Sequence, residues 1–481
     1  MNSLRKIQAW GLATKIITLI LGIAQTAIIV RILQPTQYGI AGIITSLGSL
    51  VGVSQQVGIV DATIREIAIA SEPKHRSHIF WVSLWFRLIF TVPISVILAV
   101  LAPIISEKVY HLPQLAGLLR LMSLILIFQA IQGVLGGVYT GLRAFKLLYL
   151  MQIIMAITTV PIFSILCYFY GVSGFFQAML WSAVLFIFLM VIFLRKTIGG
   201  NLSHPDKKDF VIVWKDIFHT SAWTYVSKIF SVSWQRVPLL ILGWLASPYV
   251  AGLYNAALSI GSGIVILASA IGEVNLAFLS NAFSKSLQSF KELAKKTLED
   301  VGGILILVTS FLALFPEAIL KVLAGDSYLA ASQVAVTMTW AYALFSFIDI
   351  ASNTIFVPAR KTQYRAYSLI ILVLATVISI FAFRNDPLNG TGWGILLGSL
   401  IGLFVAEFFA RTKTDISLFS KKLVLISIPG VVLFAVGLWH PSFTLRLLVF
   451  VIFGGIICAM IGENLVKKIS FVKVKVNTNE G

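Results

Sequence analysis

The sequence predicts an all-α polytopic membrane protein with about fourteen transmembrane helices. Of its 481 residues, 58% are hydrophobic and only 12% are charged, about half of the roughly 25% that is usual in soluble domains. Mean hydropathy is +0.94. A helix needs about 20 apolar residues to cross a bilayer. Stretches that meet this need are 11–33, 38–60, 79–103, 117–140, 147–170, 173–194, 219–245, 250–278, 298–321, 330–357, 366–384, 391–410, 422–439 and 443–463.

The distribution of basic residues predicts the orientation of these helices. Of the 37 Lys and Arg residues, 28 fall in segments on the side of the N-terminus, six fall on the opposite side and three lie within spans. Cytoplasmic segments of membrane proteins carry such an excess. We therefore expect both termini to be cytoplasmic. The net charge of +18 is mainly a topology signal, with some attraction to anionic lipid, and does not indicate a nucleic-acid partner.

The motifs of common catalytic sites are missing from the sequence. Cys167 and Cys458 both lie in apolar runs, and the six histidines show no ligand spacing. Neither a Walker loop nor a GxGxxG stretch occurs. The sequence therefore gives no reason to expect an enzyme, a metal site or a cofactor.

Two segments suggest an internal duplication. "PTQYGIAGIITSLGS" (35–49) and "PYVAGLYNAALSIGS" (248–262) match without gaps at Pro, Gly, Ser, Gly and Ser, at an offset of 213. Six spans separate the copies, so the repeats share their orientation, as in many transporters with a site at the repeat interface. Similar turn chemistry without duplication is the alternative. We expect an N-terminal lobe (1–200), a cytoplasmic linker (201–218), a C-terminal lobe (219–415) and two extra helices with a tail (416–481).

Polar stripes mark the helices that are expected to face water. On 219–245 the spacing of Lys228 and Gln235 with neighbouring Ser and Thr places them on one face. The first, second and eighth spans carry similar stripes. Small hydroxyl stripes often mediate helix packing, but charges within spans usually face a cavity. The candidate cavity residues are Lys228, Arg236, Tyr225, Gln235, Gln25, Gln56 and Asn255.

Four further charged residues are candidates for ion coupling or gating: Glu273, Asp349, Asp61 and Arg87. Lys228 and Glu273 lie at similar expected depths, so they could form a structural pair or a switch that a substrate or proton breaks. Asp349 and Arg87 could each serve a coupling ion or a local buried pair. Residues 283–298 predict an amphipathic interfacial helix that acts as a linker.

Three short motifs resemble one superfamily. "RILQPTQYG" (31–39) is similar to the Arg-x-Leu-Gly-Pro-x-x-Phe/Tyr-Gly turn of the multidrug/oligosaccharidyl-lipid/polysaccharide (MOP) exporters, with Gln34 in place of the usual Gly. "AGLYNAA" (251–257) and "GDSYLAA" (325–331) resemble its outer loops. Within the superfamily the chain resembles the polysaccharide-transport branch, the Wzx-type flippases, over about residues 8–420.

This resemblance implies two lobes around a central cavity that opens alternately to each side. It implies that an undecaprenyl-pyrophosphate-linked oligosaccharide moves to the outer leaflet of a prokaryotic cytoplasmic membrane, for polysaccharide synthesis such as O-antigen or capsule. H⁺ or Na⁺ is the candidate coupling ion, and polysaccharide-assembly membrane proteins are candidate partners. A lipid II flippase or a multidrug exporter of the same superfamily is the alternative. A glycosyltransferase or polymerase that uses the same lipid is less consistent with the short outer loops.

Overall fold

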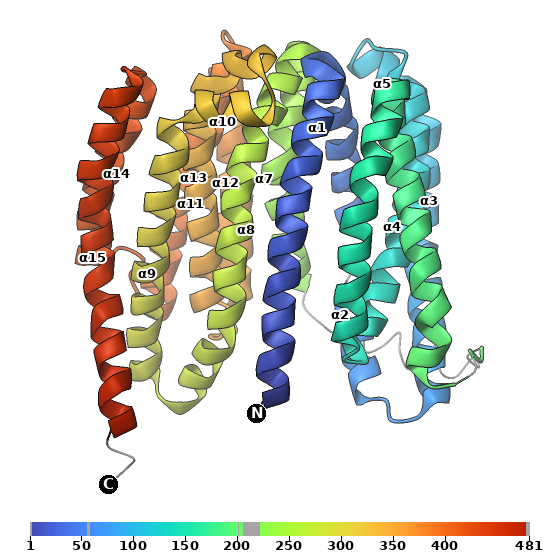
Figure 1. Cartoon of the computed structure of the whole chain (residues 1–481), viewed down its shortest axis with the longest axis horizontal. Helices are drawn as coiled ribbons and strands as arrows, with labels where there is room; N and C mark the ends of the chain where they lie inside the picture. Colours follow the sequence, from blue (N-terminus) through green and yellow to red (C-terminus); the bar gives the residue numbers. More distant parts are fainter. Residues whose placement is uncertain (1, 55–57, 201, 205–221, 478–481) are drawn as a thin grey trace. The chain divides into compact units, whose positions relative to one another are not determined.

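A computed structural model describes residues 2–54, 58–200, 202–204 and 222–477 of the chain (Figure 1). The described residues form α-helices, one π-helical turn and one 3₁₀ turn, and contain no β-strand, as the sequence predicts. In order they are α1 (Asn2–Ser54), α2 (Ile59–Ile69), α3 (Pro73–Ile104), η1 (Ile105–Val109), α4 (Leu115–Gly141), α5 (Phe145–Ile198), α7 (Ala222–Leu245), α8 (Pro248–Lys285), α9 (Leu287–Leu314), α10 (Pro316–Leu323), η2 (Asp326–Ala331), α11 (Ser332–Ile355), α12 (Thr362–Ala382), α13 (Pro387–Thr414), α14 (Lys421–Trp439) and α15 (Phe443–Asn477).

The chain is a multi-pass membrane protein. Within the described residues, eleven helical stretches are long and apolar enough to cross a bilayer. Two of them, α1 and α5, each consist of two arms joined at a non-helical residue, Gln34 and Gly171. Counting the arms separately and adding α7, each of the fourteen predicted spans corresponds to a helix. The short helices α2 and α10 were not predicted.

The chain divides into two compact units, Met1–Gly252 and Leu253–Gly481, here called unit 1 and unit 2. The predicted linker 201–218 lies mostly outside the described residues. The lobe boundaries expected from the duplication therefore remain a prediction. The expected interfacial helix 283–298 begins instead at the end of α8, and after Ser286 it continues as the first turns of the long helix α9.

The core of unit 1 lies among α2, α3, α4 and α5. Phe86, Val138 and Met190 are buried there, and the Tyr139 hydroxyl donates to the Met190 carbonyl at 2.6 Å. The two breaks in the long helices also meet, because Gln37 Oε1 of α1 accepts from the Val172 amide of α5 at 3.0 Å. A backbone group freed by a helix break must find a partner within the protein when the surroundings are lipid. This contact gives α5 that partner.

In unit 2 the last two helices pack against α9. Buried Leu314, Ile426 and Ile457 form one apolar cluster that joins α9, α14 and α15. At the end of this cluster Arg446 donates to the Leu314 carbonyl at 3.0 Å and to Glu317 at 2.6 Å. His440 Nδ1 lies 2.9 Å from the other Glu317 oxygen. The polar cluster satisfies the carbonyl at the end of α9 and fixes the start of α15.

The first residues of the two repeat-like segments, 35–39 and 248–252, cross at very short range within unit 1. A Cβ built on Gly39 would lie 1.8 Å from the Pro248 carbonyl oxygen, and one built on Gly252 would lie 1.8 Å from the Pro35 carbonyl oxygen. Matching positions of the two motifs thus make reciprocal contacts, in which each Pro begins a helical segment and each Gly admits the backbone of the other. Only glycine allows such an approach.

Gln34, in the turn formed by residues 31–39, has a strained backbone conformation. Its φ of 56° and ψ of 168° belong to a region that is essentially restricted to glycine and costs about 1–3 kcal/mol for other residues. The Gln34 side chain offsets part of this cost by donating to the Arg31 carbonyl at 2.7 Å. Gln34 therefore adopts the conformation that the usual Gly of this turn would adopt.

We expect Gln34→Gly to be more stable than Gln34→Ala by about 1 kcal/mol or more, because both lose the side-chain hydrogen bond but only Gly relieves the strain. Thermal unfolding of the purified variants in one detergent measures the difference. Equal unfolding temperatures for the two variants would contradict a strained backbone at this residue.

Gly39→Ala and Gly252→Ala are each expected to lower the free energy of unfolding by about 1–3 kcal/mol or more, because the added methyl overlaps a carbonyl oxygen. Gly22→Ala is the matched control. Nothing lies within 4 Å of a Cβ at Gly22, which is inside α1, so the control is expected to keep or raise stability. Equal behaviour of Gly39→Ala and Gly22→Ala in thermal unfolding would refute the close crossing.

Candidate functional site

Helix α7 presents two different faces within unit 1. Trp234, Leu239 and Leu242 are buried, and Gly243 lies directly against Ile43 of α1. Lys228, Val232 and Gln235 follow one another at spacings of four and three residues, which places them on one helical face. The buried residues hold α7 against α1, and this fixes the direction in which the polar face points.

That polar face borders a cavity of about 310 Å³. The second arm of α1, α4, α5 and α7 all contribute to its wall. The lining residues are Thr45, Gly48, Ser49, Gly52, Val53, Met122, Gln129, Met179, Lys228, Val232, Gln235 and Arg236. Three of the predicted cavity residues, Lys228, Gln235 and Arg236, therefore come together.

The cavity is cationic. Lys228 and Arg236 line it, and its lining contains no Asp or Glu. Lys228 is exposed and Arg236 is half-buried. Neither makes an ion pair with any side chain that the structure describes. Two positive charges among apolar helices, without a carboxylate in the same wall, attract an anion more strongly than they would in bulk water, because the surrounding apolar groups lower the effective dielectric constant.

Two hydroxyl groups of α1 add hydrogen-bond acceptors to the same wall. Thr45 Oγ1 donates to the Ala41 carbonyl at 2.8 Å, and Ser49 Oγ donates to the Thr45 carbonyl at 2.7 Å. Each hydroxyl thus donates its one proton to a carbonyl of its own helix and can act only as an acceptor toward the cavity. Lys228 and Arg236 supply donors, and the amides of Gln129 and Gln235 can act in both ways.

Two other predicted cavity residues of unit 1 make contacts elsewhere. The Tyr225 hydroxyl donates to the Ser54 carbonyl at 2.5 Å, at the end of α1. Gln25 Oε1 accepts from Thr159 Oγ1 at 3.0 Å and joins α1 to α5. Neither lines this cavity, so their place in a substrate cavity stays a prediction. Gln56 lies outside the described residues.

The charged candidates of unit 1 also differ in their surroundings. Arg87 of α3 is only 5% exposed and lies close enough to Tyr225 for an electrostatic interaction. Asp61 is exposed in the first turn of α2, where a carboxylate interacts favourably with the positive end of the helix dipole. Neither residue lines the cavity.

In unit 2, Asp349 takes part in a local network. Asp349 Oδ1 accepts from Arg365 of α12 at 2.6 Å, and Arg365 also donates to Asn353 at 2.9 Å. Of the two roles left open for Asp349, the structure therefore shows the local pair. Asn255 is half-buried in α8, and its carbonyl accepts from Ser259 at 3.1 Å. The side chain of Glu273 lies outside the described residues, which leaves its pairing with Lys228 a prediction.

Sequence reasoning missed Gln129, Met122 and Met179. A Gln within the apolar span 117–140 is the signal that could have identified Gln129. The two methionines carry no such signal, since Met fills apolar cores as often as it lines flexible binding surfaces. Among the described residues no group of three or more His, Cys, Asp or Glu is arranged to hold a metal ion.

The sequence matches one family over most of its length. The family described as "Polysaccharide biosynthesis protein" matches residues 28–333, which is 306 of 481 residues. The chain belongs to this family. The match confirms the resemblance to the polysaccharide branch that the turn motifs indicate. No curated protein matches the sequence.

Solved structures share the fold. The lipid II flippase MurJ, in an inward closed conformation, superposes with a TM-score of 0.71 at 16% identity, over 95% of this chain and 99% of that chain. An inward-facing multidrug resistance MATE transporter of the MOP superfamily gives 0.69 at 14% identity, over 83% and 94%. A MOP superfamily transporter from Pyrococcus furiosus gives 0.50 at 16%, over 85% and 93%. The chain therefore has the MOP exporter fold.

The Asp349–Arg365 pair yields a test of its structural role. Asp349→Asn is expected to lower the unfolding temperature, because it leaves a half-buried guanidinium without its carboxylate. Adding Arg365→Gln to Asp349→Asn should recover part of the loss, since both charges are then removed. Thermal unfolding of the two single variants and the double variant forms the measurement. Additive losses in the double variant would contradict a direct pair.

Proposed function

We propose that this protein is a flippase. It moves an undecaprenyl-pyrophosphate-linked oligosaccharide from the inner to the outer leaflet of a prokaryotic cytoplasmic membrane, by alternating access, for polysaccharide biosynthesis. The observation that carries the proposal is the unit 1 cavity, which presents Lys228 and Arg236 without a carboxylate in its wall. Membership of the polysaccharide biosynthesis family supports the same substrate class.

The chemistry of the cavity suits the polar part of such a lipid. A pyrophosphate is anionic and accepts charge-assisted hydrogen bonds from ammonium and guanidinium groups. Sugar hydroxyls donate to the lone pairs that Thr45 and Ser49 leave free, and the amides of Gln129 and Gln235 serve both sugar donors and acceptors. Met122 and Met179 give the wall a flexible apolar surface that adapts to different glycans. The polyprenyl tail stays in the bilayer.

A multidrug exporter fits the cavity less well. Cationic drugs would be repelled by Lys228 and Arg236, and no carboxylate in this wall would attract them. Lipid II transport is the stronger second candidate, because a lipid II flippase shares the fold over almost the whole chain. Family membership favours the polysaccharide precursor over lipid II.

The orientation and the coupling of transport belong to the same proposal. Both termini are cytoplasmic, as the excess of Lys and Arg predicts. Glu273 and Asp61 remain the candidate sites for H⁺ or Na⁺ coupling, whereas Asp349 has a local partner. Other membrane proteins of polysaccharide assembly are the proposed partners. No covalent chemistry is proposed for the chain.

The test is transbilayer movement of a fluorescent undecaprenyl-pyrophosphate oligosaccharide in liposomes that contain the purified protein. Lipid II and a cationic dye serve as comparators. The double variant Lys228→Ala/Arg236→Ala is expected to slow the oligosaccharide lipid at least tenfold, since each charged hydrogen bond contributes about 1.5–3 kcal/mol.

Lys146→Ala/Lys196→Ala is the matched control, because both of these lysines are exposed at helix ends outside the cavity. The control should transport at the normal rate. Unchanged transport by the cavity variant at a normal protein level would refute the role of the two cations. Movement of lipid II or of the dye alone would assign the chain to another branch of the superfamily.

A further inference from the structure

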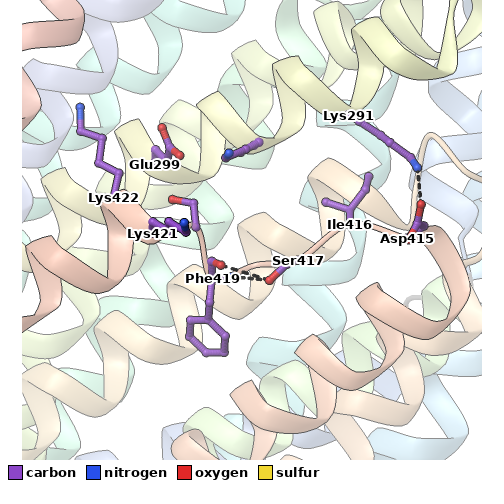
Figure 2. A pocket seen from close by; sticks show the side chains of 10 residues that line it. Lys291, Glu299, Asp415, Ile416, Ser417, Phe419, Lys421 and Lys422 are labelled. Atoms are coloured by element: carbon purple, nitrogen blue, oxygen red, sulfur yellow. Dashed lines mark hydrogen bonds and ion pairs between the residues drawn. The ribbon is translucent and has the colours of Figure 1, made fainter.

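A second charged pocket lies in unit 2, well away in sequence from the unit 1 cavity. It measures about 540 Å³ and is lined by the first turns of α9, the first turn of α14 and the segment 415–420 that connects α13 to α14. Figure 2 shows Lys421 and Lys422 on one side of it and Lys291, beside Asp415, on the other. All four of its lysines belong to segments that the charge distribution predicts to be cytoplasmic.

The pocket has an excess of positive charge. Lys291, Lys295, Lys421 and Lys422 line it together with two carboxylates, Glu299 and Asp415, which leaves a formal charge of +2. Lys291 Nζ lies 2.6 Å from Asp415 Oδ2, and its hydrogen bond and charge hold the pKa of that carboxyl below its usual value. Lys295, Lys421 and Lys422 form no ion pair within the described part of the chain.

An apolar groove adjoins this basic pocket. It encloses about 400 Å³ between α9, α11, α13 and α14, and Phe419 lines both the groove and the pocket. Ser427 is the one hydroxyl residue of the groove wall, and its hydroxyl donates to the Val424 carbonyl of its own helix at 2.7 Å. The groove wall therefore offers almost nothing to a polar ligand.

The length of the groove matches one leaflet of a bilayer. Its wall follows α14 from Leu423 to Phe434, which is about 16 Å at a rise of 1.5 Å per residue. Half of a hydrocarbon core of about 30 Å is about 15 Å. A chain that starts at the basic pocket and follows α14 would thus remain within a single leaflet.

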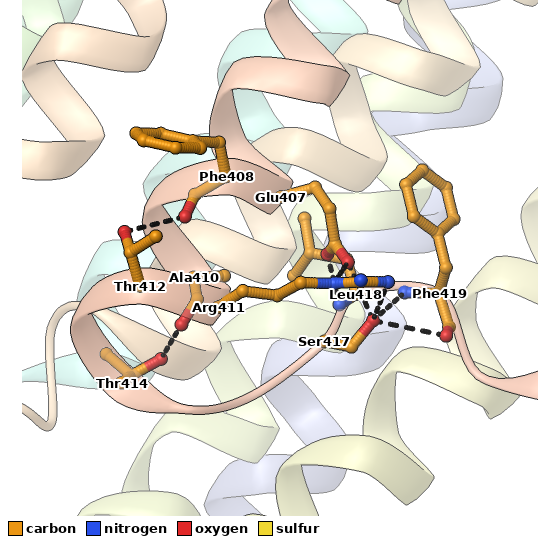
Figure 3. A network of polar contacts seen from close by, with 9 residues as sticks. All are labelled: Glu407, Phe408, Ala410, Arg411, Thr412, Thr414, Ser417, Leu418 and Phe419. Atoms are coloured by element: carbon orange, nitrogen blue, oxygen red, sulfur yellow. Dashed lines mark hydrogen bonds and ion pairs between the residues drawn. The ribbon is translucent and has the colours of Figure 1, made fainter.

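The segment between the pocket and the groove is held in place by a buried carboxylate. Glu407 of α13 is only 7% exposed, accepts from the Ser417 hydroxyl at 2.7 Å and the Leu418 amide at 2.6 Å, and pairs with Arg411 (Figure 3). Ser417 Oγ also accepts from the Phe419 amide at 3.2 Å. These bonds fix the position of Phe419 and of the start of α14. The segment between the pocket and the groove is therefore ordered without a ligand.

We propose that this pocket and groove form a binding site for an anionic phospholipid of the surrounding bilayer. The headgroup phosphate lies among Lys295, Lys421 and Lys422, and one acyl chain lies in the groove. A basic pocket alone would accept any soluble anion, and an apolar groove alone would accept any lipid. Because the two adjoin at Phe419, which lines both, they favour a molecule that has a negative head and an apolar chain. Basic pockets at the cytoplasmic ends of membrane helices recognise such lipids.

The test titrates phosphatidylglycerol into the delipidated full-length protein in detergent micelles and follows the unfolding temperature. Phosphatidylcholine and inorganic phosphate are titrated in parallel. We expect phosphatidylglycerol to raise the unfolding temperature saturably and the other two to have little effect. Equal stabilisation by phosphatidylcholine would overturn selection by the headgroup, and equal stabilisation by phosphate would assign the pocket to a soluble anion.

Two sets of variants locate the site. Lys295→Gln/Lys421→Gln/Lys422→Gln is expected to raise the half-saturating phosphatidylglycerol concentration on the order of 100-fold, at about fivefold for each lysine. The control variant Lys74→Gln/Lys146→Gln/Lys196→Gln changes the net charge by the same amount at exposed residues of unit 1. It should shift the half-saturating phosphatidylglycerol concentration less than threefold. Equal shifts for the two triple variants would overturn the proposal.

The groove is tested separately. Ser427→Phe fills the groove and is expected to weaken phosphatidylglycerol binding at least tenfold, whereas Ile428→Phe, at an exposed residue of the same helix, should not. Equal binding by the two variants would refute an acyl chain in the groove.

A competition experiment distinguishes phospholipid from the carrier lipid. If undecaprenyl phosphate displaces phosphatidylglycerol at equal or lower concentration, the site belongs to the carrier lipid instead. All of these measurements report lipid binding and none requires transport, so the lipid site can be tested independently of the proposed flippase activity.

Discussion

A charge among apolar helices must find an opposite charge, a hydrogen-bonding partner or water, and this constraint divides the charged residues of the chain into two kinds. In unit 2, Arg365 and Arg446 each contact a carboxylate of another helix, and Arg411 contacts Glu407 of its own helix. The first two pairs hold helices together. In the unit 1 cavity, Lys228 and Arg236 line a space that has no carboxylate in its wall. Positive charge left in this way attracts a ligand, and the proposed function depends on that difference.

Most of the fold could be predicted from the sequence because its signals are local. The length of the apolar stretches identified every span. The helix-breaking residues around Gln34–Pro35 and Gly171 separated the two arms of α1 and of α5 at the correct places. Helix α7 was recognised despite its two cations, since the residues around them are apolar. The helices α2 and α10, of 11 and 8 residues, are too short to cross a bilayer and form only because the packed helices beside them bury one of their faces.

The site was predictable only where its residues share one helix. Helical spacing placed Lys228 and Gln235 on one face, and the cavity confirms that they lie together. Gln25 does not line this cavity, and its partner Thr159 lies 134 residues away, a contact that no local pattern reveals. Gln129, Met122 and Met179 were missed for the same reason, since the rotation of α4 and α5 about their axes depends on tertiary packing. Asp349 could be interpreted only once Arg365 was known to face it.

The cluster around Glu317 has a consequence for how the chain is made. Arg446 follows Glu317 by 129 residues, and it also satisfies the carbonyl of Leu314. A ribosome delivers α9 and α10 to the membrane long before α15 exists. During that interval Glu317 has to remain at the water interface, and lipid rather than α15 covers Leu314. The last helix is therefore the part that completes unit 2 during biosynthesis, and a chain that stops before it would leave Glu317 and the Leu314 carbonyl without the guanidinium that binds both.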